Sequence, residues 1–253
     1  MYKFYSFLVS FILLFSSLCF SQEHSLRDSL TQAEKFYDSG KYKEAVNLYE
    51  KIVEKKQASG AVFYNLGNSY YRMGNKGKAI AAYFAAKQTL PRDPDIKHNL
   101  NFVHESIKDK INLDDSGNFS AILGFWSEFI TAKELKVFCL FASCLVLLIL
   151  IISHFVSLPF AFSYIRNTLL VFSMISLFFW QSSLSLKKDW GAVSVEESKV
   201  LSGPGDYNTV LFKLHEGAPV VLEEKKKEWY KISLPGSKKG WIKSEEISYF
   251  SQD

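Results

Sequence analysis

The order of hydrophobic and polar residues divides the chain into parts with different periodicities. Two long apolar stretches lie in the middle, at Val137–Leu158 and Thr168–Leu186, and neither contains an acidic residue, a lysine or an arginine. A helix of such length spans roughly 28–33 Å, about the thickness of the hydrocarbon core of a bilayer. Because neither stretch has the polar face of a soluble helix, we expect two transmembrane helices, at residues 135–158 and 167–186.

The eight residues between these stretches, Pro159–Arg166, leave room only for a tight turn. The two spans should therefore form a hairpin. The segments before and after the hairpin would then lie on the same side of the membrane, as two modules that share one anchor and one compartment.

Residues 22–111 show a repeat with a period of 34 residues, which is the period of the tetratricopeptide repeat (TPR) of paired helices. Small residues recur where helices approach closely, aromatic residues where a side chain fills the gap between helix pairs, and glycines where the first helix of a pair ends. The matching positions are Ala33/Gly67, Phe36/Tyr70, Gly40/Gly74, Ala45/Ala79 and Tyr49/Tyr83. Asp95–Lys110 begins a third unit without a second helix, so we expect it to cap an all-α TPR solenoid.

The concave face of such a solenoid is lined by the first helix of each pair. The residues expected there are Tyr64, Asn65, Asn68, Tyr71 and Arg72, with His98 nearby on the capping helix. Side-chain amides and aromatic rings in a groove favour the binding of an extended peptide. The alternative is that Tyr64–Asn68 is ordinary repeat sequence, in which Asn65 supports the fold.

From Trp190 onward the pattern changes to a period of 2, with turn residues between short apolar runs. The expected strands are Val193–Val195, Val210–Leu214, Val220–Glu223, Trp229–Leu234 and Gly240–Ile242. About sixty residues with five short strands predict a small closed all-β barrel at residues 190–250.

The order of motifs in this last segment resembles that of bacterial SH3-like domains. The matching motifs are Leu201–Gly205, Leu214–Gly217, Glu228–Ile232 and Gly240–Ile242. In such a barrel, Trp229, Tyr230 and Trp241 would form an aromatic groove for a ligand. The alternative is that Trp229 and Trp241 are framework residues, because aromatic side chains in so small a core are expected to pack first.

The linker at residues 112–134 is polar at first and then gathers aromatic residues. Phe125, Trp126 and Phe129 fall on one side of a helix just before the first span, which favours an interfacial helix in the lipid headgroup region. The alternative is a hydrophobic linker packed on the TPR repeats. Trp190, just after the second span, is expected at a similar depth in the bilayer.

Residues 1–21 have the layout of a secretory signal peptide. We expect cleavage near Ser21, with an uncleaved anchor or lipidation at Cys19 as alternatives. Lysines flank the open side of the hairpin, and the rule that positive flanks stay inside would place the modules in the cytoplasm. Because this bias is small and interleaved with acidic residues, we expect the export signal to prevail and both modules to be periplasmic.

Charge and residue content exclude several function classes. Residues 22–111 carry 15 basic and 11 acidic residues, and residues 187–253 carry 11 of each, so neither module has the dense basic stripe that nucleic-acid binding requires. The three cysteines (Cys19, Cys139 and Cys144) lie in apolar segments, so no disulfide joins parts of either module. Histidine spacing typical of metal sites, a phosphate loop and a Gly-x-Ser-x-Gly motif are absent from the sequence, and we expect neither a cofactor nor enzyme activity.

The whole order of parts resembles BatE-type proteins of the Bacteroides aerotolerance (Bat) group, and Asp93–Leu100 looks like the end-cap of that group. The resemblance implies partners among von Willebrand factor A-type membrane proteins and a MoxR-type AAA+ ATPase system, and a role in aerotolerance or envelope stress. We expect a multidomain membrane protein that combines a TPR solenoid, a two-helix transmembrane hairpin and an SH3-like barrel. It would act as a non-enzymatic scaffold that binds partner proteins at the outer face of the bacterial inner membrane. The alternative is an envelope sensor whose SH3-like domain binds peptidoglycan or another cell-wall ligand.

Overall fold

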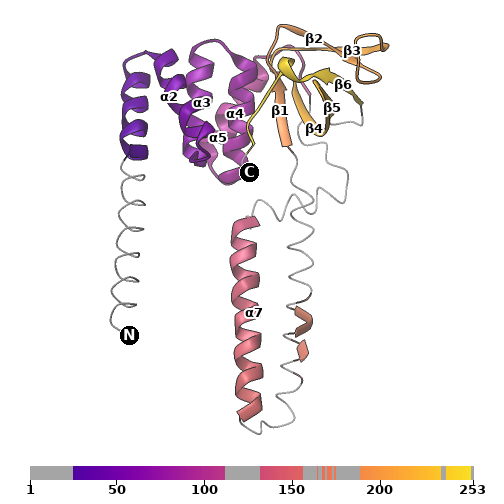
Figure 1. The fold of residues 1–253 in the computed structure, drawn as a ribbon. Coiled ribbons are helices and arrows are strands. Elements are labelled where there is room, and N and C mark those ends of the chain that lie inside the picture. Colours follow the sequence, from indigo (N-terminus) through magenta and orange to yellow (C-terminus); the bar gives the residue numbers. More distant parts are fainter. Residues whose placement is uncertain are drawn as a thin grey trace, which may run out of the picture. The chain divides into compact units, whose positions relative to one another are not determined.

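The computed structural model describes residues 25–111, 132–155, 189–234 and 238–251, together with scattered residues between 164 and 174. The chain forms two compact units (Figure 1), one made of Met1–Asp114 with Asp189–Asp253 and one made of Asp115–Lys188. Below, residues 25–111 are called the TPR module and residues 189–251 the SH3-like module. Both belong to the first unit.

The TPR module is a row of antiparallel helices, as the period of 34 residues predicted. A helix at residues 25–38 is followed by α2 (Tyr42–Glu54), α3 (Gly60–Arg72), α4 (Lys76–Thr89) and α5 (Pro94–Glu105). Successive helices from α2 to α5 pack on one another. The α5 helix starts where Asp93 accepts hydrogen bonds from the backbone N–H groups of Asp95 and Ile96, at 3.0 and 3.3 Å, with Pro94 in the first turn.

The repeated small residues lie where helices meet. Ala33, Ala45 and Ala79 are fully buried. A Cβ atom on Gly67 would lie 2.7 Å from Cε1 of Tyr83, so only glycine lets α3 approach α4 this closely. Gly74 ends α3 with a positive φ of 83°, a backbone conformation that glycine adopts without strain.

The SH3-like module is an antiparallel sheet of seven strands, with the order β3-β2-β6-β5-β4-β1-β7. Its elements are β1 (Asp189–Val193), β2 (Glu197–Leu201), β3 (Val210–His215), β4 (Pro219–Lys226), β5 (Trp229–Ser233), β6 (Lys239–Lys243), the 3₁₀ turn η1 (Ser244–Glu246) and β7 (Ile247–Tyr249). Every strand contributes a residue to a single buried cluster, from Val193 in β1 to Ile247 in β7. The sheet is therefore rolled around one core.

Three details of the predicted barrel need correction. The sequence predicted five strands, and the structure adds β2 and β7. The first strand lies at Asp189–Val193 rather than Val193–Val195. The barrel was expected to be closed, but among the described residues β3 and β7 each pair on one side only and form the edges of the sheet. The β2 strand was missed because Ser198, a small polar residue, takes a core position, where it is 1% exposed and donates a hydrogen bond to Glu246.

The two modules pack against each other through α4, which contacts β1 and β7 as well as α3 and α5. Residues 79–86 of α4 are buried on all sides, with at most 5% exposed. Trp190 of β1 stacks on Phe84, and Phe250 packs on Phe63. Trp190 was expected in the lipid headgroup region, and this expectation was wrong, because its ring lies in the junction of the modules.

The second unit is described by itself. Its helix α7 (Ala132–Phe155) begins inside the predicted linker and covers most of the first predicted span. Within the part of the chain that the structure describes, no helix meets the length and apolarity required to cross a membrane. The predicted signal peptide, the aromatic residues of the linker and nearly all of the second predicted span lie outside the described residues.

Candidate functional site

A hollow of about 260 Å³ opens on the TPR module, on the face of the first helices. It is lined by Tyr37, Asn68, Tyr71, Arg72, Tyr83, His98, Asn99, Phe102 and Val103. These residues come from the helix at 25–38 and from α3, α4 and α5. The SH3-like module contributes none of the lining residues, so its docking on α4 leaves this groove open.

The structure brings four of the six predicted groove residues together, namely Asn68, Tyr71, Arg72 and His98. The other two, Tyr64 and Asn65, lie beside the hollow rather than in its lining. The Tyr64 ring packs near Tyr83 with the centroids 6.1 Å apart, and Asn65 is hydrogen-bonded to the hydroxyl of the buried Tyr49. Asn65 thus occupies the fold-supporting position that the alternative interpretation gave it.

The lining residues that the sequence argument missed include Tyr37 and Asn99. Each stands 34 residues from a residue that was singled out, Tyr37 before Tyr71 and Asn99 after Asn65. Extending the repeat alignment to the first and third units would have found both. Tyr83 carried no such signal, because it was assigned to the gap between helix pairs.

A hydrogen-bond network fixes the two amides of the groove. Oδ1 of Asn68 accepts from the Tyr83 hydroxyl at 2.7 Å and from Nδ2 of Asn99 at 2.9 Å. Nδ2 of Asn99 also donates to the Tyr64 hydroxyl at 3.0 Å. Among the described residues, Nδ2 of Asn68 and Oδ1 of Asn99 have no partner. The groove thus offers one amide donor group and one amide acceptor, both held in place from behind.

The electrostatics of the groove are set by Arg72. Its Nε donates to the Tyr42 hydroxyl at 2.9 Å, and its guanidinium carbon lies 5.2 Å from the centroid of the Tyr42 ring. This hydrogen bond raises the pKa of Arg72 above its already high value, so the side chain is always charged. Burial raises the pKa values of Tyr37 and Tyr83, so these hydroxyls stay neutral. The lining contains no carboxylate.

The predicted aromatic site of the SH3-like module is divided between two faces of the sheet. Trp229 pairs with Lys243 and Lys231 pairs with Trp241 across β5 and β6, on the face opposite to the core. The Lys243 ammonium lies 5.7 Å from the centroid of the Trp229 ring. Tyr230 points into the core, is 7% exposed and donates to the Tyr249 hydroxyl at 2.9 Å. Tyr230 therefore does not share a surface with the two tryptophans.

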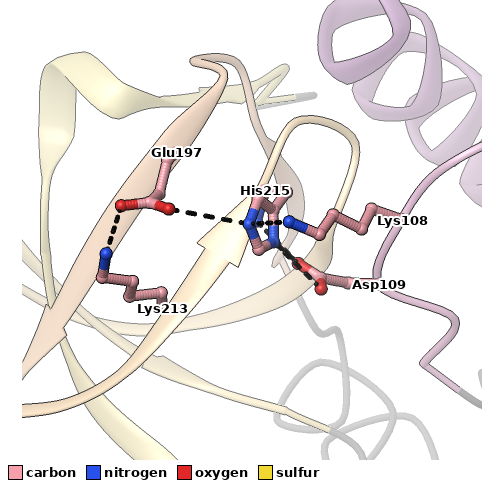
Figure 2. A network of polar contacts seen from close by, with 5 residues as sticks. All are labelled: Lys108, Asp109, Glu197, Lys213 and His215. Carbon is pink, nitrogen blue, oxygen red and sulfur yellow. Dashed lines mark hydrogen bonds and ion pairs between the residues drawn. The ribbon is translucent and has the colours of Figure 1, made fainter.

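A second polar cluster fastens the end of the TPR module to the SH3-like module (Figure 2). Asp109 accepts a hydrogen bond from the backbone N–H of His215 at 2.6 Å and lies 3.2 Å from Nδ1 of its ring. Nε2 of the same ring lies 2.7 Å from the Lys108 ammonium. Because an ammonium group only donates, Nε2 is the acceptor and Nδ1 carries the proton that is donated to Asp109.

This cluster continues into β2 and β3. Glu197 lies 3.7 Å from Nε2 of His215 and forms an ion pair with Lys213 at 2.6 Å. The arrangement joins three segments of the chain, which is a structural role. Searching the described residues for three or more His, Cys, Asp or Glu side chains that could hold a metal ion identifies no such group.

Comparison with known families supports both domain resemblances. Residues 33–74 match the TPR repeat. Residues 194–248 match the bacterial SH3 domain. A search of curated proteins returned no match. The two matched segments are those that pack against each other in the first unit.

Proposed function

We propose that the protein is a non-enzymatic scaffold that is anchored in the bacterial inner membrane and binds partner proteins at its outer face. The observation that carries this proposal is the groove of the TPR module, where the oriented amides of Asn68 and Asn99 lie among the rings of Tyr37, Tyr71 and Phe102. Main-chain groups of an extended peptide pair with such amides, while its apolar side chains pack on such rings.

The packing of the two modules supports a scaffold in particular. Because α4 is shared between the TPR helices and the strands β1 and β7, the groove and the SH3-like sheet are parts of one body. Partners bound to each module would be held at a fixed separation and orientation. Two domains on a flexible linker would not impose such a geometry.

The groove is tested by a double variant, Tyr71→Ala with Arg72→Ala, in the full-length protein. We expect partners that co-purify from native membranes to be depleted several-fold in quantitative mass spectrometry. The matched control is Tyr207→Ala with Lys199→Ala, which removes an exposed aromatic residue and a cation from the SH3-like module. Equal recovery by both variants would remove the groove from the proposal.

The membrane anchor and the periplasmic location are part of this proposal. They rest on the two apolar stretches, the expected hairpin and the export signal at the start of the chain. Reporter fusions after Ile111 and after Asp253 should both report a periplasmic location. Two cytoplasmic reports would place the same scaffold on the inner face, and opposite reports would refute the hairpin.

The resemblance to the Bat group suggests partners. We propose von Willebrand factor A-type membrane proteins and a MoxR-type ATPase system, in an aerotolerance or envelope-stress complex. Co-expression with such proteins, followed by affinity purification in mild detergent, tests this. Recovery that is lost in the groove variant but kept in its control would support direct capture by the TPR module, and equal recovery in both would contradict it.

A second candidate function is an envelope sensor that binds peptidoglycan through the SH3-like domain. The outward-facing Trp229 and Trp241, flanked by Lys231 and Lys243, favour it. Co-sedimentation of the full-length protein with purified peptidoglycan tests this function. Binding that Trp229→Ala with Trp241→Ala abolishes would favour the sensor, and no binding would leave the scaffold as the better proposal.

A further inference from the structure

The polar atoms available in the groove are mostly donors. Asn68 presents its Nδ2 amide, because its oxygen already accepts two hydrogen bonds. The terminal nitrogens of Arg72 face no carboxylate among the described residues, and only its Nε is used by Tyr42. His98 is exposed at the rim and makes no hydrogen bond within the described part of the chain. A ligand that fits this surface must bring acceptors.

The charge of the groove points in the same direction. Arg72 carries a permanent positive charge, and no lining residue carries a negative one. The nearest acidic residue in the chain is Asp38, which follows Tyr37, is exposed and is not part of the lining. An uncompensated guanidinium beside a row of neutral donors recognises a carboxylate, with which arginine forms charge-assisted and often bidentate hydrogen bonds.

An apolar surface adjoins the charged one. Phe102 is 53% exposed although it is a large aromatic residue, and the Tyr71 ring meets it edge-on with the centroids 5.8 Å apart. This pair lies one helix away from Asn68 and on the same helix as Asn99. The groove therefore combines an apolar shelf, an amide pair and a cation.

From this juxtaposition we infer that the groove binds an internal acidic segment of a partner protein, in extended conformation, through an Asp or Glu side chain at Arg72 and an apolar side chain on Tyr71 and Phe102. The inference rests on the proposed function and names the class of partner. An internal segment is favoured over a chain end because Asn68 and Asn99 offer a donor and an acceptor together. This pair matches a peptide group whose chain continues in both directions.

The test uses the full-length protein in detergent micelles and an array of random heptapeptides that contain Asp or Glu. Each peptide is paired with a copy in which Asn or Gln replaces the acid, and all peptides have amidated C-termini. Affinities of the best pairs are then measured by fluorescence polarisation. We expect the acidic peptide to bind about 10- to 100-fold more tightly than its amide copy, as for hydrogen bonds to charged groups.

Two variants locate this preference. Arg72→Gln should bring the ratio of the two affinities close to one without changing the melting temperature, because Arg72 is exposed. Lys97→Gln removes the same charge from an exposed position of α5 outside the lining, and should leave the ratio unchanged. An equal loss in both variants would show a general charge effect and would overturn the inference.

The remaining outcomes separate the inference from the proposed function. If acidic and amide peptides bind equally well and Tyr71→Ala weakens both, the groove binds peptides but the acidic specificity is wrong. If only peptides with a free C-terminal carboxylate bind in a second array, the groove takes chain ends and the internal segment is wrong. If no peptide of any kind binds, the peptide groove itself is refuted, and the proposed function fails with it.

Discussion

The indole of Trp190 stacks on the ring of Phe84, with the centroids 4.8 Å apart and the ring planes inclined by 19°. These residues are far apart in the chain, one in β1 of the SH3-like module and the other in α4 of the TPR module. Each ring supplies the other with buried apolar surface. The two modules therefore stabilise each other.

The first prediction concerns this stack. Phe84 is 5% exposed, and we expect Phe84→Ala to destabilise the first unit by about 3–5 kcal/mol, the usual cost of removing a buried phenylalanine. Chemical denaturation followed by tryptophan fluorescence should show the loss. Phe102→Ala, at an exposed position of α5, is the control and should change stability by much less. Equal effects would contradict the shared core.

Gly77 separates helix propensity from packing. In an isolated helix, Gly→Ala raises stability by roughly 1 kcal/mol. Here a Cβ atom on Gly77 would lie 2.1 Å from the carbonyl oxygen of Val193, so α4 and β1 would have to move apart. We expect Gly77→Ala to lower the melting temperature and to speed proteolysis at the junction. Lys87→Ala, at an exposed position of the same helix, should do neither, and a stabilised Gly77→Ala would refute the close contact.

Two glycines of the repeat should respond differently to substitution. At Gly67 a side chain would collide with the ring of Tyr83, whereas at Gly40 nothing lies within 4 Å and the only penalty is the positive φ of 74°. Gly67→Leu should therefore unfold the TPR module. Gly40→Ala should cost about 1 kcal/mol, the strain of a left-handed residue with a side chain. A normal circular-dichroism melting curve for Gly67→Leu would count against the repeat alignment.

The Asp109–His215 hydrogen bond predicts a local effect at the junction. Removing the acceptor with Asp109→Ala should cost about 1–3 kcal/mol, because a half-buried backbone N–H is left without a partner. Asp109→Asn keeps an acceptor oxygen and should cost less. Hydrogen exchange at the His215 amide is the direct measurement. Equal exchange in both variants would mean that the side chain at position 109 does not protect this amide.

Acid should weaken the SH3-like module through Glu223. The hydrogen bond from Lys239, at 2.6 Å, lowers the pKa of Glu223 below its usual 4.5, with a smaller contribution from Lys231. A carboxyl group whose pKa falls on folding stabilises the folded state above its unfolded pKa. That stabilisation is lost as the pH falls through the lower folded-state pKa. It is thus present at pH 7 and disappears below about pH 4.5.

We therefore expect Glu223→Gln to lower the melting temperature at pH 7 by no more than about 3 °C, because exposed ion pairs contribute at most about 1 kcal/mol. At pH 3 the variant and the wild type should melt together. Glu224→Gln, on the same strand, is the control. A difference between Glu223→Gln and the wild type that persists at pH 3 would exclude the ion pair as its cause.

The TPR module was predictable because its determinants are local. Ala45 and Ala79, or Gly40 and Gly74, do the same task one repeat apart, so residue type recurs at the spacing of the helices. Four groove residues followed from this periodicity, and Asn99 would have followed from extending it. The strands β3 to β6 were also predictable, because turn residues separate short runs with alternating side chains.

Contacts between distant segments were decided only by the tertiary structure. Ser198 and Glu246 are 48 residues apart, and Asp109 and His215 are 106 apart, so neither pair leaves a periodic trace in the sequence. The alanine-rich α4 has no polar face, and its sequence alone does not say what covers each side. Burial depends on which surfaces meet in space. The docking of the SH3-like sheet on α4 therefore determined why this helix is apolar all round and which face of the repeats stays open for a partner.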